Sequence, residues 1–147
     1  MERIGENLTL GYEAFKTPPR EGYYYSNGGF EYTPPGWVKL ESNWYPLGYR
    51  VTTLENKSLG LDNNHNILTY KPNEWIGIEQ RDLVADIRGR GGVWTAIKRS
   101  DAWKLQRLCL EKHGMKTRIY LAAVYNPVFA TSYRVKSEKI MLLEELR

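Results

Sequence analysis

The chain has 147 residues, the size of one ordinary domain that can bury a core of its own. Its apolar content of 41%, with eleven tyrosines and five tryptophans, excludes wholesale disorder. No apolar run approaches the roughly 20 residues that span a bilayer, and the first residues lack the apolar segment of a signal peptide. We therefore expect a soluble, cytoplasmic protein.

The net charge of +4 hides an asymmetry along the chain. Residues 81–139 contain thirteen Lys or Arg against five Asp or Glu, a local excess of +8, so the remaining residues carry −4. Charge separated in this way can concentrate an anionic partner at one surface. A basic face that meets only solvent is the alternative interpretation.

Residues 1–46 form a first segment that is rich in aromatic residues, Pro and Gly. Ten of the aromatic residues lie in it, and two Pro-Pro pairs oppose helix formation. Asn27-Gly28 is a hairpin turn signal, which predicts that Gly22–Tyr25 pairs with Phe30–Thr33. We expect this N-terminal arm either to fold onto its own domain or to wrap a neighbouring subunit of a homo-oligomer.

Residues 47–147 form the predicted core domain. Residue types favour strands at Tyr49–Leu54, Ile67–Tyr70, Val93–Ile97 and Thr117–Tyr125. Turn chemistry separates these runs, and most of the connections are short. The core is therefore expected to be built largely of β-structure.

One helix is predicted after the third of these strands. Ser100 is expected to cap its first turn, and Asp101 adds a negative charge where the helix dipole is positive. Gly114 is the expected stop. The apolar side comprises Ala102, Leu105, Leu108 and Cys109. On that side, the lone cysteine is expected to be a buried, unreactive thiol.

The C-terminal part is less clearly patterned. Asn126-Pro127 predicts a turn, and Phe129–Val135 is a strand candidate. Ser137–Leu146 is either a closing strand or a helix capped by Ser137. The predicted fold is α+β, with a mainly antiparallel sheet, one principal helix packed across a face, and the aromatic-rich arm in front.

Side chains alternate across a strand, so spacing predicts which residues share a face. If the helix covers the more apolar face, cationic and aromatic side chains gather on the other, joined by Arg50 if its strand is in register. The Arg88–Gly92 loop could add backbone amides to a phosphate cradle, although a simple flexible turn is the alternative. The candidate ligand-binding residues are Arg88, Arg90, Trp94, Lys98, Arg118, Tyr120, Tyr133, Arg134 and Lys136.

Such a surface suits a nucleotide or single-stranded nucleic acid, because arginine binds phosphate and aromatic rings stack on bases. Sequence motifs that are typical of catalytic or metal sites are lacking. His65 and His113 are the only histidines, and neither has a partner at metal-ligand spacing. The glycine loop is not a P-loop, because no Lys-Ser/Thr follows it. We therefore expect no metal, no cofactor and no catalytic residue.

Six stretches carry a family resemblance. They are Tyr49–Leu54, Lys57–Leu61, Glu74–Ile76, Gly92–Ala96, Thr117–Tyr120 and Tyr133–Ser137. Together they resemble small uncharacterised proteins of phages and bacterial mobile elements. That resemblance implies an accessory protein that antagonises host defence by binding an effector complex or by sequestering a nucleotide signal. A second similarity is to ADP-ribosyltransferases, in which Arg50 and Glu145 would be the strand arginine and the late glutamate, although the intervening Ser-Thr-Ser pattern is absent.

The leading hypothesis is a non-enzymatic binder of an anionic nucleotide or another phosphate-bearing ligand, such as a phage protein that sequesters a host defence signal. The first alternative is a protein that binds nucleic acid or a host defence complex through the same basic face. An ADP-ribosyltransferase-like enzyme and a purely structural, oligomer-forming protein are the others.

Overall fold

The computed structural model describes residues 3–7, 12–15, 25–27, 30–60, 67–77 and 92–147. These residues form antiparallel strands and a single helix, which confirms the predicted α+β class. The elements are β1 (Arg3–Asn7), β2 (Tyr12–Phe15), β3 (Tyr25–Asn27), β4 (Phe30–Tyr32), β5 (Trp37–Leu40), β6 (Asn43–Thr53), β7 (Trp75–Gly77), β8 (Val93–Ala96), α1 (Arg99–His113), β9 (Thr117–Ala130) and β10 (Arg134–Leu146).

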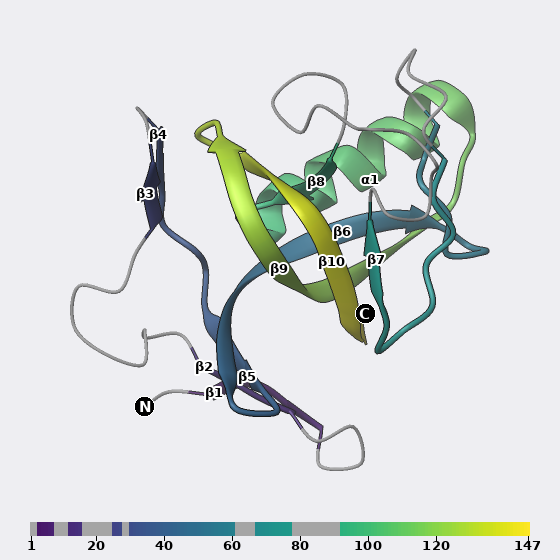
Figure 1. The fold of residues 1–147 in the computed structure, drawn as a ribbon. Helices are drawn as coiled ribbons and strands as arrows, with labels where there is room; N and C mark the ends of the chain where they lie inside the picture. Colours follow the sequence, from purple (N-terminus) through teal and green to yellow (C-terminus); the bar gives the residue numbers. More distant parts are fainter. Residues whose placement is uncertain (1–2, 8–11, 16–24, 28–29, 61–66, 78–91) are drawn as a thin grey trace.

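Four strands close into a ring. β6 pairs with β9, β9 with β10, β10 with β8, and β8 returns to β6. The return link is a single residue pair, Tyr49 with Ala96. It depends on Gly48, where an added Cβ would lie 2.3 Å from the Thr95 Cγ2 atom. Figure 1 shows β9 and β10 curving together across β6. Closure leaves these strands few free edges.

The N-terminal segment adds strands to the same sheet. β5 pairs with β6, β2 with β5, and β1 with β2. Tyr12, Ala14 and Val38 from these strands are buried together with Leu47 and Leu121 of the ring. The boundary suggested between residues 46 and 47 falls inside β6.

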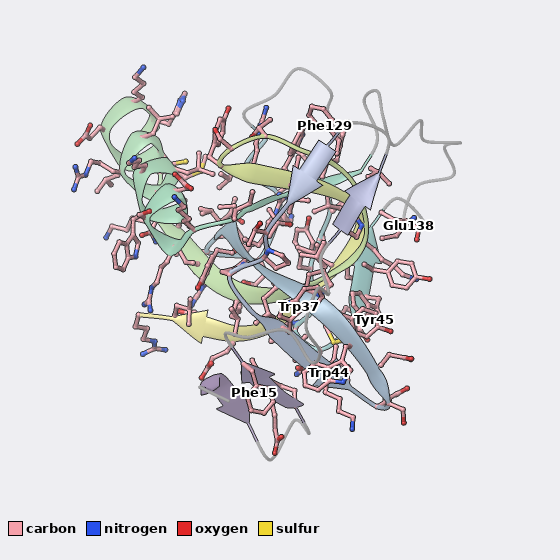
Figure 2. The ribbon with its side chains drawn as sticks, turned by 90° about the vertical axis from the view of Figure 1, so that its left-hand side faces the viewer. Phe15, Trp37, Trp44, Tyr45, Phe129 and Glu138 are labelled. Carbon is pink, nitrogen blue, oxygen red and sulfur yellow. The ribbon has the colours of Figure 1, made fainter. Side chains whose placement is uncertain are left out.

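Aromatic side chains gather where β2, β5 and β6 meet. Figure 2 shows Phe15, Trp37, Trp44 and Tyr45 at this end of the molecule. The ring centroids of Phe15 and Trp44 are 5.9 Å apart, and Trp37 is 2% exposed. These aromatic residues of the N-terminal segment therefore lie against the chain's own sheet.

The hairpin predicted around Asn27 is present as a separate two-stranded sheet, β3 with β4. Its outer pair is Tyr25 with Tyr32, so the first strand lies closer to the turn than expected. The remainder of the predicted first strand, residues 22–24, and the turn residues 28–29 lie outside the described part of the chain.

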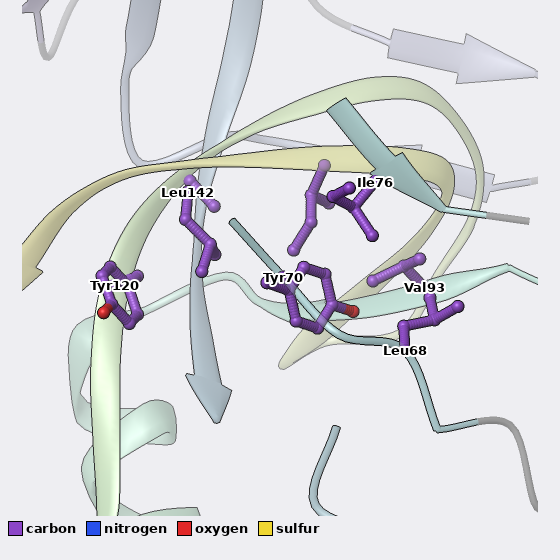
Figure 3. Packing of buried hydrophobic residues seen from close by; sticks show 8 residues of the cluster. Leu68, Tyr70, Ile76, Val93, Tyr120 and Leu142 are labelled. Carbon is purple, nitrogen blue, oxygen red and sulfur yellow. The ribbon is translucent and has the colours of Figure 1, made fainter. Parts of the chain in front are cut away.

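The core lies on both faces of β9. Tyr120 and Ala122 belong to a cluster with residues of β7, β8 and β10, shown in Figure 3. The alternate residues Ile119 and Leu121 face α1 and the N-terminal strands respectively. Residues 119–124 are all at most 6% exposed. A strand covered on both faces has an almost continuous apolar sequence, which is why this run could be predicted as a strand.

Helix α1 ends as predicted but begins earlier. Gly114 adopts the left-handed conformation at φ 61°, and its N–H donates to the carbonyl of Leu110. Asp101 lies in the first turn as expected. The predicted cap at Ser100 is wrong, because the extended residue Lys98 takes the N-cap position without a side-chain hydrogen bond. Ala102 and Cys109 bury against the sheet.

Three predictions about the C-terminal part are wrong. β9 runs through Asn126-Pro127 instead of turning there. Pro127 pairs with Ser137, and the register shift between Lys136 and Ser137 leaves a bulge directly after the proline. The turn falls at residues 131–133, so the strand expected at Phe129–Val135 is divided between β9 and β10. The helix alternative for Ser137–Leu146 is also wrong.

Partners on both sides explain why this last segment is a strand. β10 pairs with β9 along one edge and with β8 and β7 along the other. Ile140 and Leu142 are fully buried, whereas the alternating Met141 remains partly exposed. Tertiary pairing thus overrides the local helix signal at Ser137.

Candidate ligand-binding site

A cavity of about 960 Å³ opens between the ring, α1 and the turn that precedes β10. Pockets for small molecules have volumes of roughly 300–1,000 Å³. Its walls come from Tyr49–Val51 of β6, Ser58–Gly60 with Leu68 and Tyr70, Gly92–Ala96 of β8, the first turns of α1, and Ser132–Arg134. We call this space the central cavity.

Helix α1 contributes one flank to the central cavity. Asp101, Lys104, Leu105 and Leu108 follow one another at helical spacing along that flank. Leu108 was predicted to be core, but it is 40% exposed because it faces the cavity. The helix therefore divides its apolar residues between the sheet and the cavity.

Arg50 is the cation held deepest in the central cavity. Its Nη1 donates to the carbonyl oxygen of Trp94 at 2.6 Å, and its Nη2 donates to the Ser58 Oγ at 3.3 Å. Its guanidinium carbon lies 5.2 Å from the centroid of the Tyr70 ring. No carboxylate among the described residues pairs with this guanidinium. A partly buried charge without a counter-ion is costly unless a ligand supplies one.

Three polar atoms of this region are buried without a hydrogen-bond partner. They are the Arg50 Nε, the Tyr70 hydroxyl and the Thr95 Oγ1. Tyr70 is 2% exposed and Thr95 is 1% exposed, and both residues line the central cavity. Buried polar groups are normally paired, and an unpaired one costs roughly 1–3 kcal/mol. All three atoms are enclosed by protein and have almost no accessible surface, so they are not open to the cavity.

The wall beside Arg50 is built from two short segments held by hydrogen bonds. The strand predicted at Ile67–Tyr70 is reduced to one isolated bridge, between Lys57 and Thr69. The Ser58 Oγ accepts from the Leu68 N–H at 3.0 Å as well as from Arg50. This hydroxyl therefore fixes both the wall and the guanidinium.

Tyr120 supports the same wall from below. Its hydroxyl donates to the Asn56 Oδ1 at 2.9 Å, and the Asn56 carbonyl accepts from the Tyr70 N–H at 2.7 Å. Figure 3 shows Tyr70 and Tyr120 in the same buried hydrophobic cluster. Tyr120 is thus a positioning residue rather than a stacking surface.

The rim of the central cavity is cationic. Lys98, Lys104 and Arg134 are exposed around it, and Asp101 is the one carboxylate among the described lining residues. With Arg50, the lining residues that the structure describes carry four positive charges against one negative charge. A concave surface of one sign attracts ligands of the other and raises their local concentration.

Trp94 lies under a pair of cations. The Arg134 guanidinium carbon is 3.9 Å from the Trp94 ring centroid, and the Lys136 Nζ is 5.2 Å from it. Cross-strand pairing explains this contact, since Lys136 lies opposite Trp94 in the β8–β10 ladder. Arg134 therefore already occupies a face of this ring, as cation–π attraction favours.

The structure distributes the sequence-predicted ligand residues over several places. Trp94, Lys98, Tyr133 and Arg134 line the central cavity. Lys136 is 4% exposed and lies against Trp94. Arg118 and Tyr120 lie outside the lining, and Arg88 and Arg90 fall outside the described residues.

Arg118 and Trp94 lie toward opposite ends of β9, and Arg118 does not line the central cavity even though its strand partner Thr52 is two residues from Arg50. Arg118 lies at the start of this strand, whereas Phe129, whose ring contacts Trp94, lies near its end. Its Nη1 forms a 2.7 Å ion pair with Glu145, and its Nε donates to the Leu54 carbonyl. Strand alternation predicts the side of a sheet but not the position along it. That is why Arg118 and Trp94 were expected together.

Several lining residues were missed by sequence reasoning. Ser58, Tyr70 and Lys104 had no motif or period that would bring them together, and Thr95 was placed on the opposite face from the ligand residues. Arg50 was expected only as an outlying member of the basic face. The one sequence signal for Arg50 was its position on the predicted strand Tyr49–Leu54, which must pair with a strand distant in the sequence.

The described residues give little support for a metal site, a reactive cysteine or an Arg50–Glu145 catalytic pair. No group of three or more His, Cys, Asp or Glu side chains gathers there in a way that could hold a metal ion. Cys109 is fully buried, and burial raises the pKa of its thiol. Glu145 pairs with Arg118 and is not among the cavity-lining residues, so it does not meet Arg50 there.

No protein-family model, no curated protein and no solved structure matches this chain. In the described part of the chain, no helix is both long enough and apolar enough to cross a membrane. The central cavity is therefore the main basis for an inference about function.

Proposed function

We propose that this protein binds a small anionic ligand of the nucleotide class in the central cavity and does not transform it. The observation that carries the proposal is Arg50, which lies in the cavity without a carboxylate partner among the described residues. An anion placed there would supply the missing counter-charge, and hydrogen bonds to charged groups are the stronger ones.

The cavity's composition favours a nucleotide over a simple ion. Leu105 and Leu108 of α1, with Leu59 and the exposed Tyr133, offer apolar and aromatic surface to a base. The exposed cations at the rim suit phosphate oxygens. A volume of about 960 Å³ is far more than a free phosphate ion needs.

Binding without turnover agrees with the lining residues. Among the described ones, Asp101 is the only carboxylate and neither His nor Cys is present, so a nucleophile paired with a general base is lacking there. The resemblance to phage proteins suggests a use for such a binder: it would hold a signalling nucleotide away from a host defence receptor.

A calorimetric titration of a panel of linear and cyclic nucleotides tests the proposal. We expect at least one nucleotide to bind the wild-type chain. Arg50→Gln should weaken binding roughly tenfold or more, because a charge-assisted hydrogen bond is lost. Arg107→Gln is the matched control, since Arg107 is an exposed cation of α1 outside the central cavity.

Circular dichroism of Arg50→Gln separates a lost ligand contact from a lost fold. The absence of binding by every phosphate-bearing compound would overturn the proposal. Equal weakening by the two variants would also count against it, because only net charge would then matter.

Nucleic-acid binding is the second candidate, favoured by cations that continue along α1 beyond the cavity. Arg107, Lys112 and Lys116 are all exposed there. Polyanion binding would fall steeply with salt, in proportion to the phosphates neutralised. A nucleotide in the cavity should lose less affinity over the same salt range, so a salt titration separates the two.

A further inference from the structure

We propose that a groove on the outer side of α1 binds an acidic, amphipathic segment of another protein. The groove has a volume of about 590 Å³ and lies between α1 and the segments where β6 ends and β9 begins. We call it the outer groove. Its lining consists of Leu54, residues 115–117, and Trp103, Gln106, Arg107 and Leu110 of α1. This inference does not depend on nucleotide binding in the central cavity.

Large apolar side chains are exposed along the outer groove. Trp103 and Leu110 are each 54% exposed, and Leu54 is 43% exposed. Trp103 and Leu110 lie on the same side of α1, two turns apart. The residues of this helix that face the sheet and the central cavity lie on its other sides. Exposed apolar side chains that gather in one place mark a surface that another molecule covers.

Contacts within the chain hold the outer groove in shape. The Gln106 Nε2 donates to the Thr117 carbonyl oxygen at 3.1 Å, which ties α1 to the start of β9. The Arg99 guanidinium carbon lies 5.1 Å from the centroid of the Trp103 ring, and the Arg99 Nη2 donates to the carbonyl oxygen of Arg147. These contacts restrain the Trp103 ring, so little side-chain freedom is lost when a partner packs on it.

The charge of the outer groove is positive. Arg107 and Lys116 line it and are exposed, and none of its described lining residues is an Asp or a Glu. Glu55 and Glu111, the carboxylates next to the lining residues in the sequence, do not line the groove. Complementary charge across an interface speeds association and selects the partner. A partner that fits therefore carries carboxylates beside its apolar side chains.

The mixture of side chains favours a protein over a nucleic acid or a membrane. Trp, Met and Arg are enriched where proteins bind one another, and Trp103, Met115 and Arg107 lie together here. Nucleic-acid interfaces are polar and strongly positive, whereas half of these lining residues are apolar. A groove also admits single protruding side chains, which a flat bilayer does not offer. An amphipathic helix presents such side chains along one face.

Three fluorescently labelled peptides of about 14 residues, or roughly four helical turns, test this inference by fluorescence anisotropy. The first carries Leu along one helical face and Glu on the other. The second has Lys in place of Glu, and the third is a scrambled form of the first. We expect the first to bind the wild-type chain roughly tenfold or more tightly than either of the others. This comparison needs no variant to fold.

Variants locate the binding surface. Trp103→Ala should weaken binding of the acidic peptide roughly tenfold, because Trp is enriched among the residues whose truncation costs the most affinity. Lys116→Gln should weaken it severalfold at low salt and less at high salt, where the charges are screened. Ile67→Ala and Lys71→Gln are the matched controls, since both residues are exposed outside the outer groove. Circular dichroism checks that each variant is folded.

Other results overturn the inference. One is equal binding of the acidic and basic peptides, and another is no binding of any peptide. Binding of a single-stranded oligonucleotide or of anionic vesicles that Trp103→Ala abolishes, without binding of the acidic peptide, would assign the groove to a nucleic acid or a membrane. A dimer that is seen by light scattering and lost in Trp103→Ala would assign it to a second copy of this chain. None of these results changes the proposal for the central cavity.

Discussion

Single residues in this protein depend on partners that are distant in the chain. Arg50 is held by Trp94 and Ser58, and the wall beside it is held by Tyr120 through Asn56. Each contact restrains a side chain that would otherwise move among several orientations, and so holds it in one geometry. The cavity is thus shaped by neighbours as much as by its own lining.

Tyr12 provides a pH-dependent test at this scale. Its hydroxyl is buried and donates to the Glu144 Oε2 at 3.2 Å. Burial, and then the Glu144 carboxylate, raise the pKa of Tyr12 above its ordinary value. Because the folded pKa exceeds the unfolded value of about 10, this stabilisation is present below pH 10 and is lost as the pH rises toward the folded pKa.

We expect Tyr12→Phe to lower the free energy of unfolding by about 1 kcal/mol at pH 8. The difference from wild type should disappear or slightly reverse at pH 11, since each pH unit above the unfolded pKa removes about 1.4 kcal/mol of the wild type's advantage. Urea unfolding at both pH values measures this. Tyr133→Phe, at an exposed position, is the control, and a Tyr12→Phe difference that does not change with pH would contradict the account.

Helix α1 serves three environments with one short stretch of sequence. Ala102 and Cys109 face the sheet, Leu105 and Leu108 face the central cavity, and Trp103 is 54% exposed on the outer side. The apolar pattern of the helix therefore marked residues that face the cavity as well as residues that face the core. The C-terminal end of the helix was easier to predict, because the glycine stop at Gly114 is local, whereas the N-cap was predicted at Ser100 and lies at Lys98.

The C-terminal cap of α1 can be tested by substitution. Gly114 has φ 61°, and an added Cβ would meet no atom within 4 Å. Gly114→Ala should therefore cost about 1 kcal/mol through the backbone alone. Gly114→Asn should cost less, because asparagine tolerates the left-handed conformation better. Thermal unfolding of both variants checks this, and equal losses would mean that steric contact matters instead.

At the scale of the whole molecule, the N-terminal strands and the ring share one core. Val38 of β5 is fully buried in the same cluster as Leu121 of β9. Sheet pairing through β6 joins them as well. Unfolding should therefore be cooperative across both parts.

Val38→Ala tests that cooperativity. We expect the free energy of unfolding to fall by about 2 kcal/mol, with one transition that is the same by circular dichroism and by tryptophan fluorescence. Leu110→Ala, at a position that is 54% exposed on α1, should change it by less than about 0.5 kcal/mol. Two separate transitions in Val38→Ala would show that the N-terminal strands fold independently.

The sequence by itself determined the features that depend on neighbours within a few residues. It predicted the helix, its Gly114 stop, a mainly antiparallel sheet and a shared face for Trp94, Arg134 and Lys136. These signals are local. A helix cap involves residues three or four apart, and strand alternation involves residues two apart.

Only the tertiary structure decided which distant segments meet. β10 is a strand because β9 and β8 pair with it on its two sides. Arg118, near the start of β9, forms an ion pair with Glu145. The wall that carries Ser58 and Tyr70 has no repeating pattern at all. Closure of a ring joins residues such as Tyr49 and Ala96, and no local preference along the chain encodes such a pairing.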